Sequence, residues 1–269
     1  MGGLAMRRKY FFFDIDGTLT NNPQGGNIPA STKAAIRELR RKGHFLAIAT
    51  GRAYAMAEAY LDEFDFDNMV SDGGNAVTIN RKLQGIEPLD KKLAVTLIDE
   101  CEAKGIPWGV SYENARCRWC KNTAFLKRTR DSYMETKIDP DLDVHELSEI
   151  YKVYVCCDEG SETAIQGLKD LPYARYHPDY VFVEPDDKAK GIYKIMDYFH
   201  APYEDVVVFG DGKNDLKMFR EEWTSIAMGN AIPELKAKAT FVTKSVDDGG
   251  IAYACRHFGW IDGDENEAA

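Results

Sequence analysis

Two short apolar runs, each followed by aspartate and glycine, constrain the fold of this chain more than any other feature. The run YFFF at 10–13 leads into DIDGT at 14–18, and the run VVVF at 206–209 leads into GDG at 210–212. Apolar runs of this length, broken by glycine, are typical of buried strands. In open α/β sheets, ligands bind at the carboxyl ends of the strands, so these acidic turns predict a site at the edge of such a sheet.

The segments around both runs alternate between strand and helix patterns. The first part predicts strands at 10–15, 45–49 and 69–71, and helices at 31–42 (with Ser31 as N-cap) and 54–61. The last part predicts strands at 206–209, 225–228 and 241–243, and helices at 214–220, 233–238 and 251–258. Strand–helix–strand units with short loops form right-handed crossovers. We therefore expect an α/β core built on a parallel sheet.

Between these two parts the composition and the pattern change. Residues 83–185 hold most of the cysteines, a basic stretch at 121–130, a predicted helix at 91–104 and predicted strands at 151–157 and 180–184. This predicts an inserted α+β domain with boundaries near Gln84-Gly85 and Pro185-Asp186-Asp187. The predicted domains are a core formed by 1–84 and 186–269 and an insert formed by 85–185. The polar end at 262–269 is expected to fray.

The composition argues against several kinds of partner. With 34 Lys and Arg against 44 Asp and Glu, the net charge is −10, which disfavours nucleic acid or an anionic membrane as the main partner. No apolar run approaches the roughly 20 residues of a membrane-spanning helix, and residues 1–6 are too few for a signal peptide. Six cysteines show no disulfide framework, and the one CxxC pair, Cys117 and Cys120, lacks the second pair that a zinc site needs. We expect a soluble cytoplasmic protein with free thiols, and the sequence does not indicate its oligomeric state.

The first acidic turn has the residues of a metal-dependent nucleophilic site. Asp14 and Asp16 are two residues apart, and two buried acids this close repel each other unless a cation lies between them. A divalent metal such as Mg²⁺ meets that need. Asp14 would then be held ionised and free to attack, while Asp16 would pass a proton. The Thr18 hydroxyl and the amides after Gly17 would line a small anion-binding nest. The simpler alternative is an Asx-type turn.

The second acidic turn supplies further oxygen ligands. Asp211, Asn214 and Asp215 lie within five residues of one another after the predicted strand at 206–209. Carboxylate and amide oxygens suit a hard cation such as Mg²⁺, which binds through few carboxylates and keeps several waters. The turn therefore has the oxygen donors of a metal site, and the simpler alternative is an ordinary polar turn.

Two further motifs carry groups suited to a phosphate. Thr50 and Gly51 follow the predicted strand at 45–49, where a hydroxyl and backbone amides can bind phosphate oxygens. Taken alone, this string is an ordinary strand-to-helix turn. Lys190 could neutralise both the nucleophile and the phosphate, and Lys188 competes for that role. We prefer Lys190 because Gly191 and the amphipathic helix that follows set its register.

In this order, the motifs resemble the four motifs of the haloacid dehalogenase superfamily phosphatases. They are DxDGT at 14–18, TGR at 50–52, KG at 190–191 and GDGxND at 210–215. The large insert is similar to the cap of the Cof-type branch, subclass IIB. The strings AMGNA at 227–231 and DDGG at 247–250, near the end of the chain, are also similar to that branch. The resemblance implies a Rossmann-like core that carries the site and an α+β cap that selects the substrate. Because DGG at 72–74 departs from the Asn-Gly that the branch often has there, no binding role is carried onto Asp72.

The resemblance also implies a mechanism that these residues can support. Asp14 attacks phosphorus to form an aspartyl-phosphate, and Asp16 protonates the leaving alcohol and then activates water. The implied metal is Mg²⁺, which neutralises charge on the transferring group, and the implied substrate is a small phosphorylated metabolite such as a sugar phosphate. The implied metal-binding groups are Asp14, the backbone carbonyl of Asp16 and Asp211, with Asn214 and Asp215 supporting, and the implied phosphate-binding residues are Thr50, Gly51 and Lys190.

Substrate choice is expected to depend on the insert, where no motif is specific. The candidates are Tyr112, Arg116, Arg118, Trp119, Lys121 and Arg128. For any one of them, a solvated or packed side chain is the simpler interpretation. Two other functions stay open: a phosphomutase on the same scaffold, and a non-catalytic sensor of a phosphorylated ligand. The intact pair Asp14 and Asp16 argues against the sensor.

Overall fold

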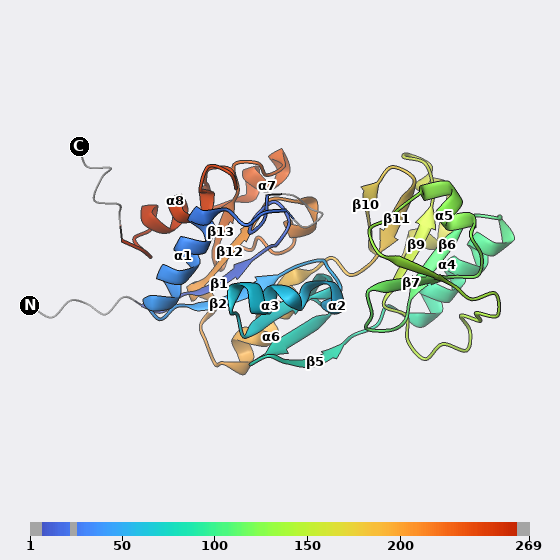
Figure 1. The fold of residues 1–269 in the computed structure, drawn as a ribbon, viewed down its shortest axis with the longest axis horizontal. Helices are drawn as coiled ribbons and strands as arrows, with labels where there is room; N and C mark the ends of the chain where they lie inside the picture. The colour runs from blue at the N-terminus through green and yellow to red at the C-terminus, as the bar shows by residue number, and fades with distance from the viewer. Residues whose placement is uncertain (1–6, 22–25, 263–269) are drawn as a thin grey trace, which may run out of the picture. The chain divides into compact units, whose positions relative to one another are not determined.

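The structure is a computed structural model that describes residues 7–21 and 26–262. The prediction for 1–6 and, except for Asp262, the predicted frayed end at 262–269 lie outside the described residues. Asp262 accepts a hydrogen bond from Lys42 Nζ at 2.5 Å. The chain divides into two compact units (Figure 1). The first is formed by Met1–Thr50, Ala59–Gln84 and Asp187–Ala269, and the second by Gly51–Glu58 and Gly85–Asp186. None of the helices in the described part of the chain has the length and apolar character that crossing a bilayer requires.

The first unit is built on a mainly parallel sheet, as the strand–helix alternation predicts. Its order is β14-β13-β12-β1-β2-β3-β4-β5, parallel from β14 to β3, with β4 antiparallel to β3. The α/β class is therefore confirmed, although β4 and β5 were not predicted. The strands are β1 (Tyr10–Phe13), β2 (Phe45–Ala49), β3 (Asn68–Ser71), β4 (Ala76–Ile79), β5 (Lys82–Ile86), β12 (Val206–Gly210), β13 (Thr224–Ala227) and β14 (Phe241–Val242).

The helices of the first unit lie close to their predicted positions, and two details of the prediction fail. These helices are α1 (Ala30–Arg41), α3 (Ala59–Phe64), α6 (Lys188–Tyr198), α7 (Pro233–Lys238) and α8 (Gly250–His257). The predicted N-cap Ser31 is wrong, because α1 begins at Ala30 and Pro29 occupies the cap without a side-chain hydrogen bond. The predicted helix at 214–220 is also wrong: only a 3₁₀ turn forms there, at Lys213–Asp215.

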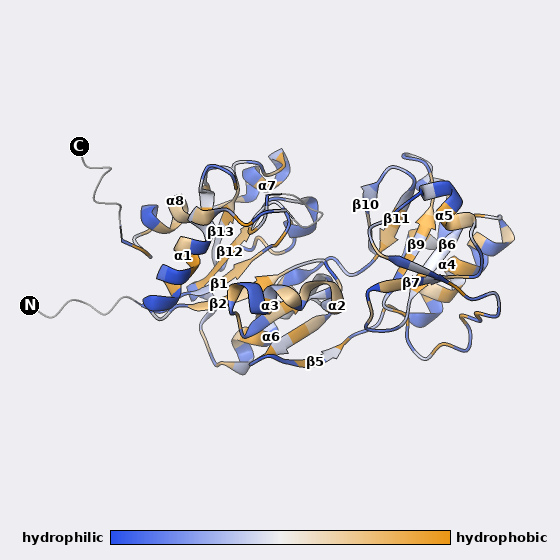
Figure 2. Ribbon diagram, in the orientation of Figure 1, coloured by the Kyte–Doolittle hydropathy of each residue, from blue (hydrophilic) through white to orange (hydrophobic). Residues whose placement is uncertain are grey.

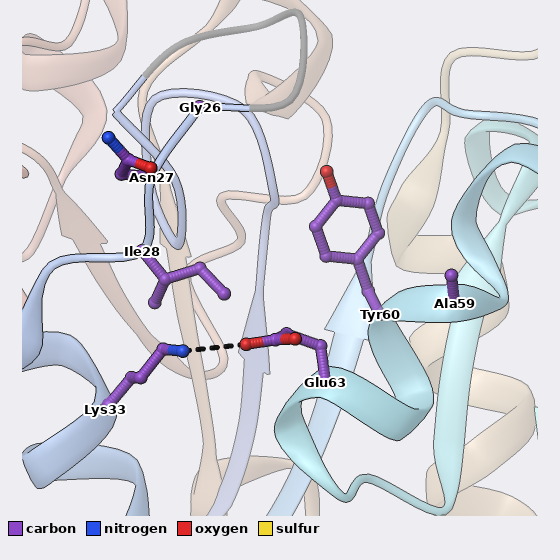
Figure 3. Close-up of a pocket in the computed structure, with 7 residues that line it drawn as sticks. All are labelled: Gly26, Asn27, Ile28, Lys33, Ala59, Tyr60 and Glu63. Carbon is purple, nitrogen blue, oxygen red and sulfur yellow. Dashed lines mark hydrogen bonds and ion pairs between the residues drawn. The ribbon is translucent and has the colours of Figure 1, made fainter.

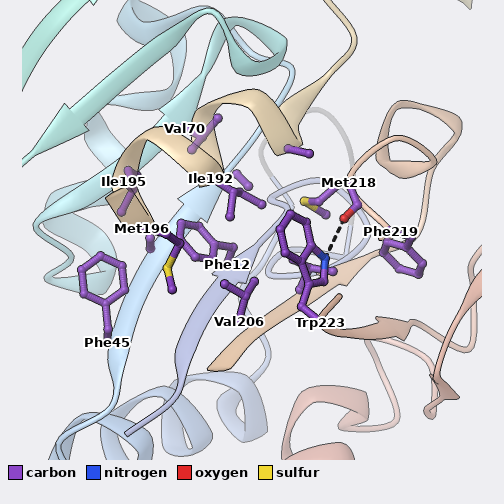
Figure 4. Packing of buried hydrophobic residues seen from close by; sticks show 14 of the residues in the cluster. Phe12, Phe45, Val70, Ile192, Ile195, Met196, Val206, Met218, Phe219 and Trp223 are labelled. Carbon is purple, nitrogen blue, oxygen red and sulfur yellow. Dashed lines mark hydrogen bonds between the residues drawn. The ribbon is translucent and has the colours of Figure 1, made fainter. Parts of the chain in front are cut away.

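The aromatic run of β1 explains why this strand lies in the middle of the sheet. Successive side chains of a strand point to opposite faces. Phe12 joins a buried cluster with α6 side chains such as Ile192 and Met196 (Figure 4). Phe11 faces the other way, where its ring lies 5.1 Å from that of Trp260, just after α8. Burying both faces removes the apolar strands, orange in Figure 2, from water, which is the main driving force for folding.

The strand order reverses between β1 and β12. From β1 the chain proceeds through β2 to β3 on one side, and from β12 through β13 to β14 on the other. The crevice outside such a switch point is where open α/β sheets bind ligands. Asp14 follows β1 directly and Asp211 follows β12, so the topology places both acids at this crevice.

The second unit is an α+β structure, as predicted for the insert. Its sheet has the order β10-β11-β9-β6-β7-β8 and is antiparallel except for the β7–β8 pair. Helix α4 lies on this sheet and shares a buried apolar cluster with it. The elements are β6 (Trp108–Ser111), β7 (Cys117–Cys120), β8 (Glu135–Ile138), β9 (Lys152–Cys156), β10 (Tyr173–His177), β11 (Tyr180–Val183), α2 (Tyr54–Ala57), α4 (Lys91–Ala103) and α5 (Ala124–Thr129).

The segment Gly51–Glu58 belongs to the second unit, although the predicted core domain included it. Two cationic side chains of the second unit hold its backbone. Arg116 Nε donates to the carbonyl of Ala55 at 2.7 Å, and Lys152 Nζ donates to the carbonyl of Gly51 at 2.9 Å. The sequence offered no signal for these contacts, because both acceptors are backbone atoms.

Candidate active site

Three aspartates converge at the switch point of the first sheet. One carboxylate oxygen from each of Asp14, Asp211 and Asp215 lies within 4.8 Å of the others. Asp14 is anchored through its amide, which donates to the carbonyl of Phe209 on β12 at 3.0 Å. The Oδ2 of Asp215 accepts from the amides of Asp211 and Gly212, at 2.9 Å each. These backbone bonds fix the positions of all three acids relative to the ends of β1 and β12.

Lys188 lies between two of these acids. Its Nζ donates to Asp14 Oδ1 and to Asp215 Oδ1, each at 2.6 Å, and the side chain is fully buried at the first residue of α6. Although burial lowers the pKa of Lys188, the charges of Asp14 and Asp215 raise it above the ordinary value of a lysine. The lysine is therefore charged and directly bonded to the predicted nucleophile.

Gly17 and Thr18 shape the space beside Asp211. At Gly17 the φ angle is +78°, and a Cβ there would lie 2.1 Å from Asp211 Oδ2, so only glycine fits. Thr18 Oγ1 donates to Asp211 Oδ1 at 3.1 Å. The predicted anion nest at this turn is wrong, because the amides of Gly17, Thr18 and Leu19 donate to carbonyls within the turn itself.

The acids outnumber the cation bonded to them, and their pKa values show the consequence. Burial raises the pKa of Asp14 well above its usual range, Lys188 opposes this, and the charges of Asp215, Asp211 and Asp16 raise it further. Burial, followed by the charge of Asp215, raises the pKa of Asp211 to about 7. Three carboxylates that face one lysine leave an excess of negative charge that a divalent cation would neutralise, and their oxygen donors suit Mg²⁺. The residues present therefore fit such an ion.

The remaining predicted ligands lie beside this cluster. Asp16 is half-buried and forms an isolated β-bridge with Thr20, and its charge contributes to the pKa values of Asp14 and Asp211. Its carboxylate is not part of the three-acid cluster found among the described residues. Asn214 is half-buried in the 3₁₀ turn Lys213–Asp215. Its Oδ1 lies 2.6 Å from where a Cβ of Gly212 would be.

The predicted phosphate-binding residues have mixed positions. Thr50 is buried at the end of β2, where its amide donates to Val70 and its carbonyl accepts from Gly73. Gly51 lies in the second unit. Lys190 Nζ donates to Asn75 Oδ1 at 3.0 Å. The structure thus brings Lys188, the competing candidate, to the carboxylates instead of the preferred Lys190.

Asp72, to which no role was given, is buried and has a φ angle of +51° in the turn after β3. Its Oδ2 accepts from the Ser71 hydroxyl at 3.2 Å. The carboxylate of Asp72 thus bonds its own neighbour in the turn.

The substrate-recognition candidates of the second unit have partners within that unit. Arg118 is completely buried and bonded to Asp131, so it is not available to a ligand at the surface. The centre of the Trp119 ring lies 5.7 Å from that of the Tyr112 ring and 5.0 Å from the Nζ of Lys137. Two further candidate cations are paired with acids at 2.7 Å each: Lys121 with Glu102 and Arg128 with Asp158.

The first unit also has an open pocket of about 360 Å³ away from the acids (Figure 3). Lys33 and Glu63 face each other across it and form an ion pair of 2.7 Å. Because these charges already satisfy each other and are both nearly half exposed, the pocket lacks the unbalanced polar groups of the switch-point site.

The cysteines form no metal site. All six are free and buried, and no cysteine belongs to a metal-ligand cluster among the described residues. Burial raises the pKa of Cys101 and of Cys156 to about 12, so both thiols stay protonated.

Asn230 is a site residue that the sequence interpretation did not assign. Its Nδ2 donates to the carbonyl of Gly17 at 2.8 Å and lies 3.5 Å from Asp211 Oδ2, while its Oδ1 accepts from the amide of Val246 at 3.0 Å. The side chain thereby connects the turn after β1, Asp211 after β12 and the loop before α8. The string AMGNA at 227–231 contained this residue, but the string alone does not indicate what Asn230 contacts.

Comparison with known proteins agrees with this geometry. A profile of haloacid dehalogenase-like hydrolases matches residues 11–255. YkrA of Bacillus subtilis (strain 168), named as a candidate phosphatase, is 32% identical over 95% of this chain and 100% of its own length. The 5-amino-6-(5-phospho-D-ribitylamino)uracil phosphatase YwtE of the same organism is 26% identical over 91% of this chain and 96% of its own.

A solved structure gives the same result. The subclass IIB sugar phosphatase BT4131 superposes with a TM-score of 0.77 at 28% identity, covering 94% of this chain and 100% of its own. The resemblance drawn from the four motifs is thus confirmed over nearly the whole sequence, and the chain belongs to the haloacid dehalogenase-like hydrolase family.

Proposed function

We propose that this protein is a magnesium-dependent phosphatase that acts on a small phosphorylated metabolite through an aspartyl-phosphate on Asp14. The observation that carries the proposal is the buried carboxylate of Asp14 at the switch point, bonded to Lys188 and clustered with two further acids. A carboxylate that Lys188 orients, and that a bound divalent cation would keep ionised, is suited to nucleophilic attack on phosphorus.

The proposed reaction has two steps. In the first, Asp14 attacks phosphorus, the bond from phosphorus to the leaving oxygen breaks, and Asp16 gives that oxygen a proton. In the second, Asp16 accepts a proton from a water molecule, the water attacks the phosphoryl group, and Asp14 is released with inorganic phosphate.

The other site residues have supporting roles in this proposal. Lys188 bonds Asp14 and would also attract phosphoryl oxygens, the role for which Lys190 was preferred from the sequence. Thr50 and Gly51 would bind the same oxygens. When bound, Mg²⁺ would neutralise negative charge on the phosphoryl group. The residues that would hold it are Asp14, the backbone carbonyl of Asp16, Asp211 and Asp215, with Asn214 beside them.

The names of two relatives support a substrate class. YwtE is named for a phosphorylated ribityl compound and BT4131 for sugar phosphates. The compounds in both names carry a phosphate on a polyhydroxylated carbon chain. We therefore propose a phosphate monoester of a sugar or a sugar alcohol as the substrate, in a cytoplasm whose reducing conditions fit six free thiols.

Release of inorganic phosphate tests the function. Purified protein should hydrolyse 4-nitrophenyl phosphate with Mg²⁺ and lose that activity in a chelator. A panel of sugar and polyol phosphates, ranked by kcat/KM, then identifies the substrate class. Transfer to a second sugar hydroxyl without phosphate release would instead indicate a phosphomutase, and binding without either reaction would indicate a sensor.

A further inference from the structure

The second unit contains a buried ion pair that the proposed mechanism does not use. Lys152 begins β9 and Glu184 follows β11, its antiparallel neighbour. Both residues are 5% exposed, and Lys152 Nζ lies 2.5 Å from Glu184 Oε2. A buried ion pair is weak evidence for stability, because an apolar pair of similar volume often stabilises a fold as well or better. The pair therefore calls for an explanation in what else it contacts.

Lys152 also bonds the backbone of Gly51. Its Nζ donates to the carbonyl of Gly51 at 2.9 Å. Gly51 is the first residue after the chain leaves the first unit, and Glu184 lies two residues before the chain leaves the second unit at Asp186. The ammonium group of Lys152 thus bonds Gly51, where the chain first enters the second unit, and Glu184, near where it finally leaves that unit.

The two sides of the Thr50-Gly51 turn are held by different groups. Thr50 is fixed within the first unit, because its amide donates to the carbonyl of Val70 at 2.9 Å and its carbonyl accepts from Gly73 at 3.2 Å. Gly51 has no side chain by which packing could fix its peptide group. The hydrogen bond from Lys152 supplies that restraint, and the ion pair with Glu184 directs the ammonium group.

We propose that Lys152 is a positioning residue for the phosphate-binding turn Thr50-Gly51, oriented by Glu184. The inference rests on the proposed function only for the statement that this turn binds phosphoryl oxygens. Lys152 itself touches neither substrate nor metal in this proposal. Its effect arises because a small displacement of a binding group weakens the contact that the group makes.

The test is the affinity of the protein for inorganic phosphate, measured by titration calorimetry with Mg²⁺ present, together with kcat and KM for 4-nitrophenyl phosphate. Lys152→Met should raise the Kd for phosphate and the KM about tenfold, with a smaller change in kcat. Lys152→Arg retains a charged donor and should restore part of the affinity. Glu184→Gln should weaken phosphate binding less than Lys152→Met does.

A charge-neutral double variant separates positioning from folding. Lys152→Met alone leaves the carboxylate of Glu184 buried without a partner, which can destabilise the unit. In Lys152→Met with Glu184→Leu, no buried charge is left over, so the Tm should stay near that of the wild type while phosphate binding is still weakened about tenfold. A folded double variant that binds phosphate as the wild type does would overturn the proposal.

Lys104 provides a matched control. Its Nζ also bonds one carboxylate, Glu100 Oε1 at 2.6 Å, and one backbone carbonyl, Ala164 at 3.0 Å, elsewhere in the second unit. Lys104→Met should leave phosphate binding unchanged. Equal losses in Lys104→Met and Lys152→Met would refute a specific role for Lys152.

The outcomes also distinguish this inference from the proposed function. If the wild type binds phosphate and hydrolyses no ester, the function fails, but weaker binding by the double variant still supports positioning. If the wild type hydrolyses esters and the double variant is unaffected, the inference fails alone. If the wild type binds no phosphate, there is no such turn to position, and the inference is wrong.

Discussion

In the part of the chain that the structure describes, two cationic side chains are completely buried, one in each unit, and they have opposite surroundings. Arg118 of the second unit is bonded to one acid, Asp131, and its guanidinium carbon lies 4.4 Å from the centre of the Phe125 ring and 5.2 Å from that of Tyr154. Lys188 of the first unit bonds two acids, with the third acid of the cluster beside them.

This difference distinguishes a buried cation whose charge is balanced from one that faces an excess of acids. Around Arg118, one guanidinium faces one carboxylate and aromatic rings lie against the guanidinium, so no charge is left for a further ion to neutralise. Around Lys188 the acids are in excess, and the raised pKa of Asp14 reflects burial together with the neighbouring acids. Under the proposed function, this excess of acids is what a bound divalent cation would neutralise.

The largest effect is expected at Asp14. Replacing it with asparagine removes the proposed nucleophile and should lower kcat about 10⁴-fold or more. Because the same change removes one acid from an excess, the Tm of the metal-free protein should not fall. Phosphate release and thermal unfolding in a chelator measure the two quantities. Asp14→Asn with wild-type activity would remove the basis of the mechanism.

The opposite pattern is expected at Arg118. Arg118→Met leaves Asp131 buried without its partner and should cost about 3–5 kcal/mol of unfolding free energy, measured by urea unfolding. The kcat of the protein that remains folded should change little. Adding Asp131→Leu should recover most of the stability, since neither charge is then left alone. A large loss of kcat in the folded Arg118→Met protein would show that this balanced cluster takes part in catalysis after all.

Metal binding should stabilise the protein through the unbalanced cluster. At a Mg²⁺ concentration about 100 times its Kd, the unfolding free energy should rise by about 2.7 kcal/mol, seen as a higher Tm. Asp211→Asn should remove most of this increase. Asp131→Asn is the control: it should lower the Tm in the absence of metal and leave the increase intact. If Asp211→Asn responds to Mg²⁺ as the wild type does, Asp211 is not a ligand.

The strand-end acids could be predicted from sequence because strands and their turns leave strong local signals. The apolar runs before Asp14 and Asp211 predict buried strands, and parallel pairing then brings the strand ends together. The choice between Lys188 and Lys190 depended instead on where α6 begins. Residues two apart on a helix point about 200° away from each other, so an error in register exchanges them. Gly191, used to set that register, packs against Val70, and a Cβ there would lie 2.4 Å from it.

The predicted helix at 214–220 failed for a different reason. Asp215 turns its carboxylate back onto the amides of Asp211 and Gly212 and toward Lys188. These long-range and local side-chain bonds favour a 3₁₀ turn over a helix, and no periodicity reveals them. Among the unpredicted strands, β6 (WGVS), β7 (CRWC), β8 (ETKI) and β10 (YARYH) mix polar and apolar residues and lack the continuous apolar run of β1.

The smallest effect is expected from removing one threonine hydroxyl beside each of the two buried cations. Thr18 Oγ1 donates to Asp211 in the unbalanced cluster, and Thr136 Oγ1 accepts from Arg118 Nε in the balanced one, at 2.9 Å. Each threonine-to-valine change removes one hydrogen bond and should cost about 1 kcal/mol of stability. Thr18→Val should in addition weaken Mg²⁺ about tenfold, because an outer partner of a metal ligand orients that ligand.

Calorimetric titration of Mg²⁺ into both variants decides between the two roles. Thr136→Val should bind Mg²⁺ with wild-type affinity, since the hydroxyl it loses serves a cluster whose charges already balance. Thr18→Val should differ from it in metal affinity even where the two proteins have the same Tm. Equal Mg²⁺ affinities in the two variants would mean that Thr18 only supports the fold. The distinction between a balanced and an unbalanced buried charge would then end at the carboxylates themselves.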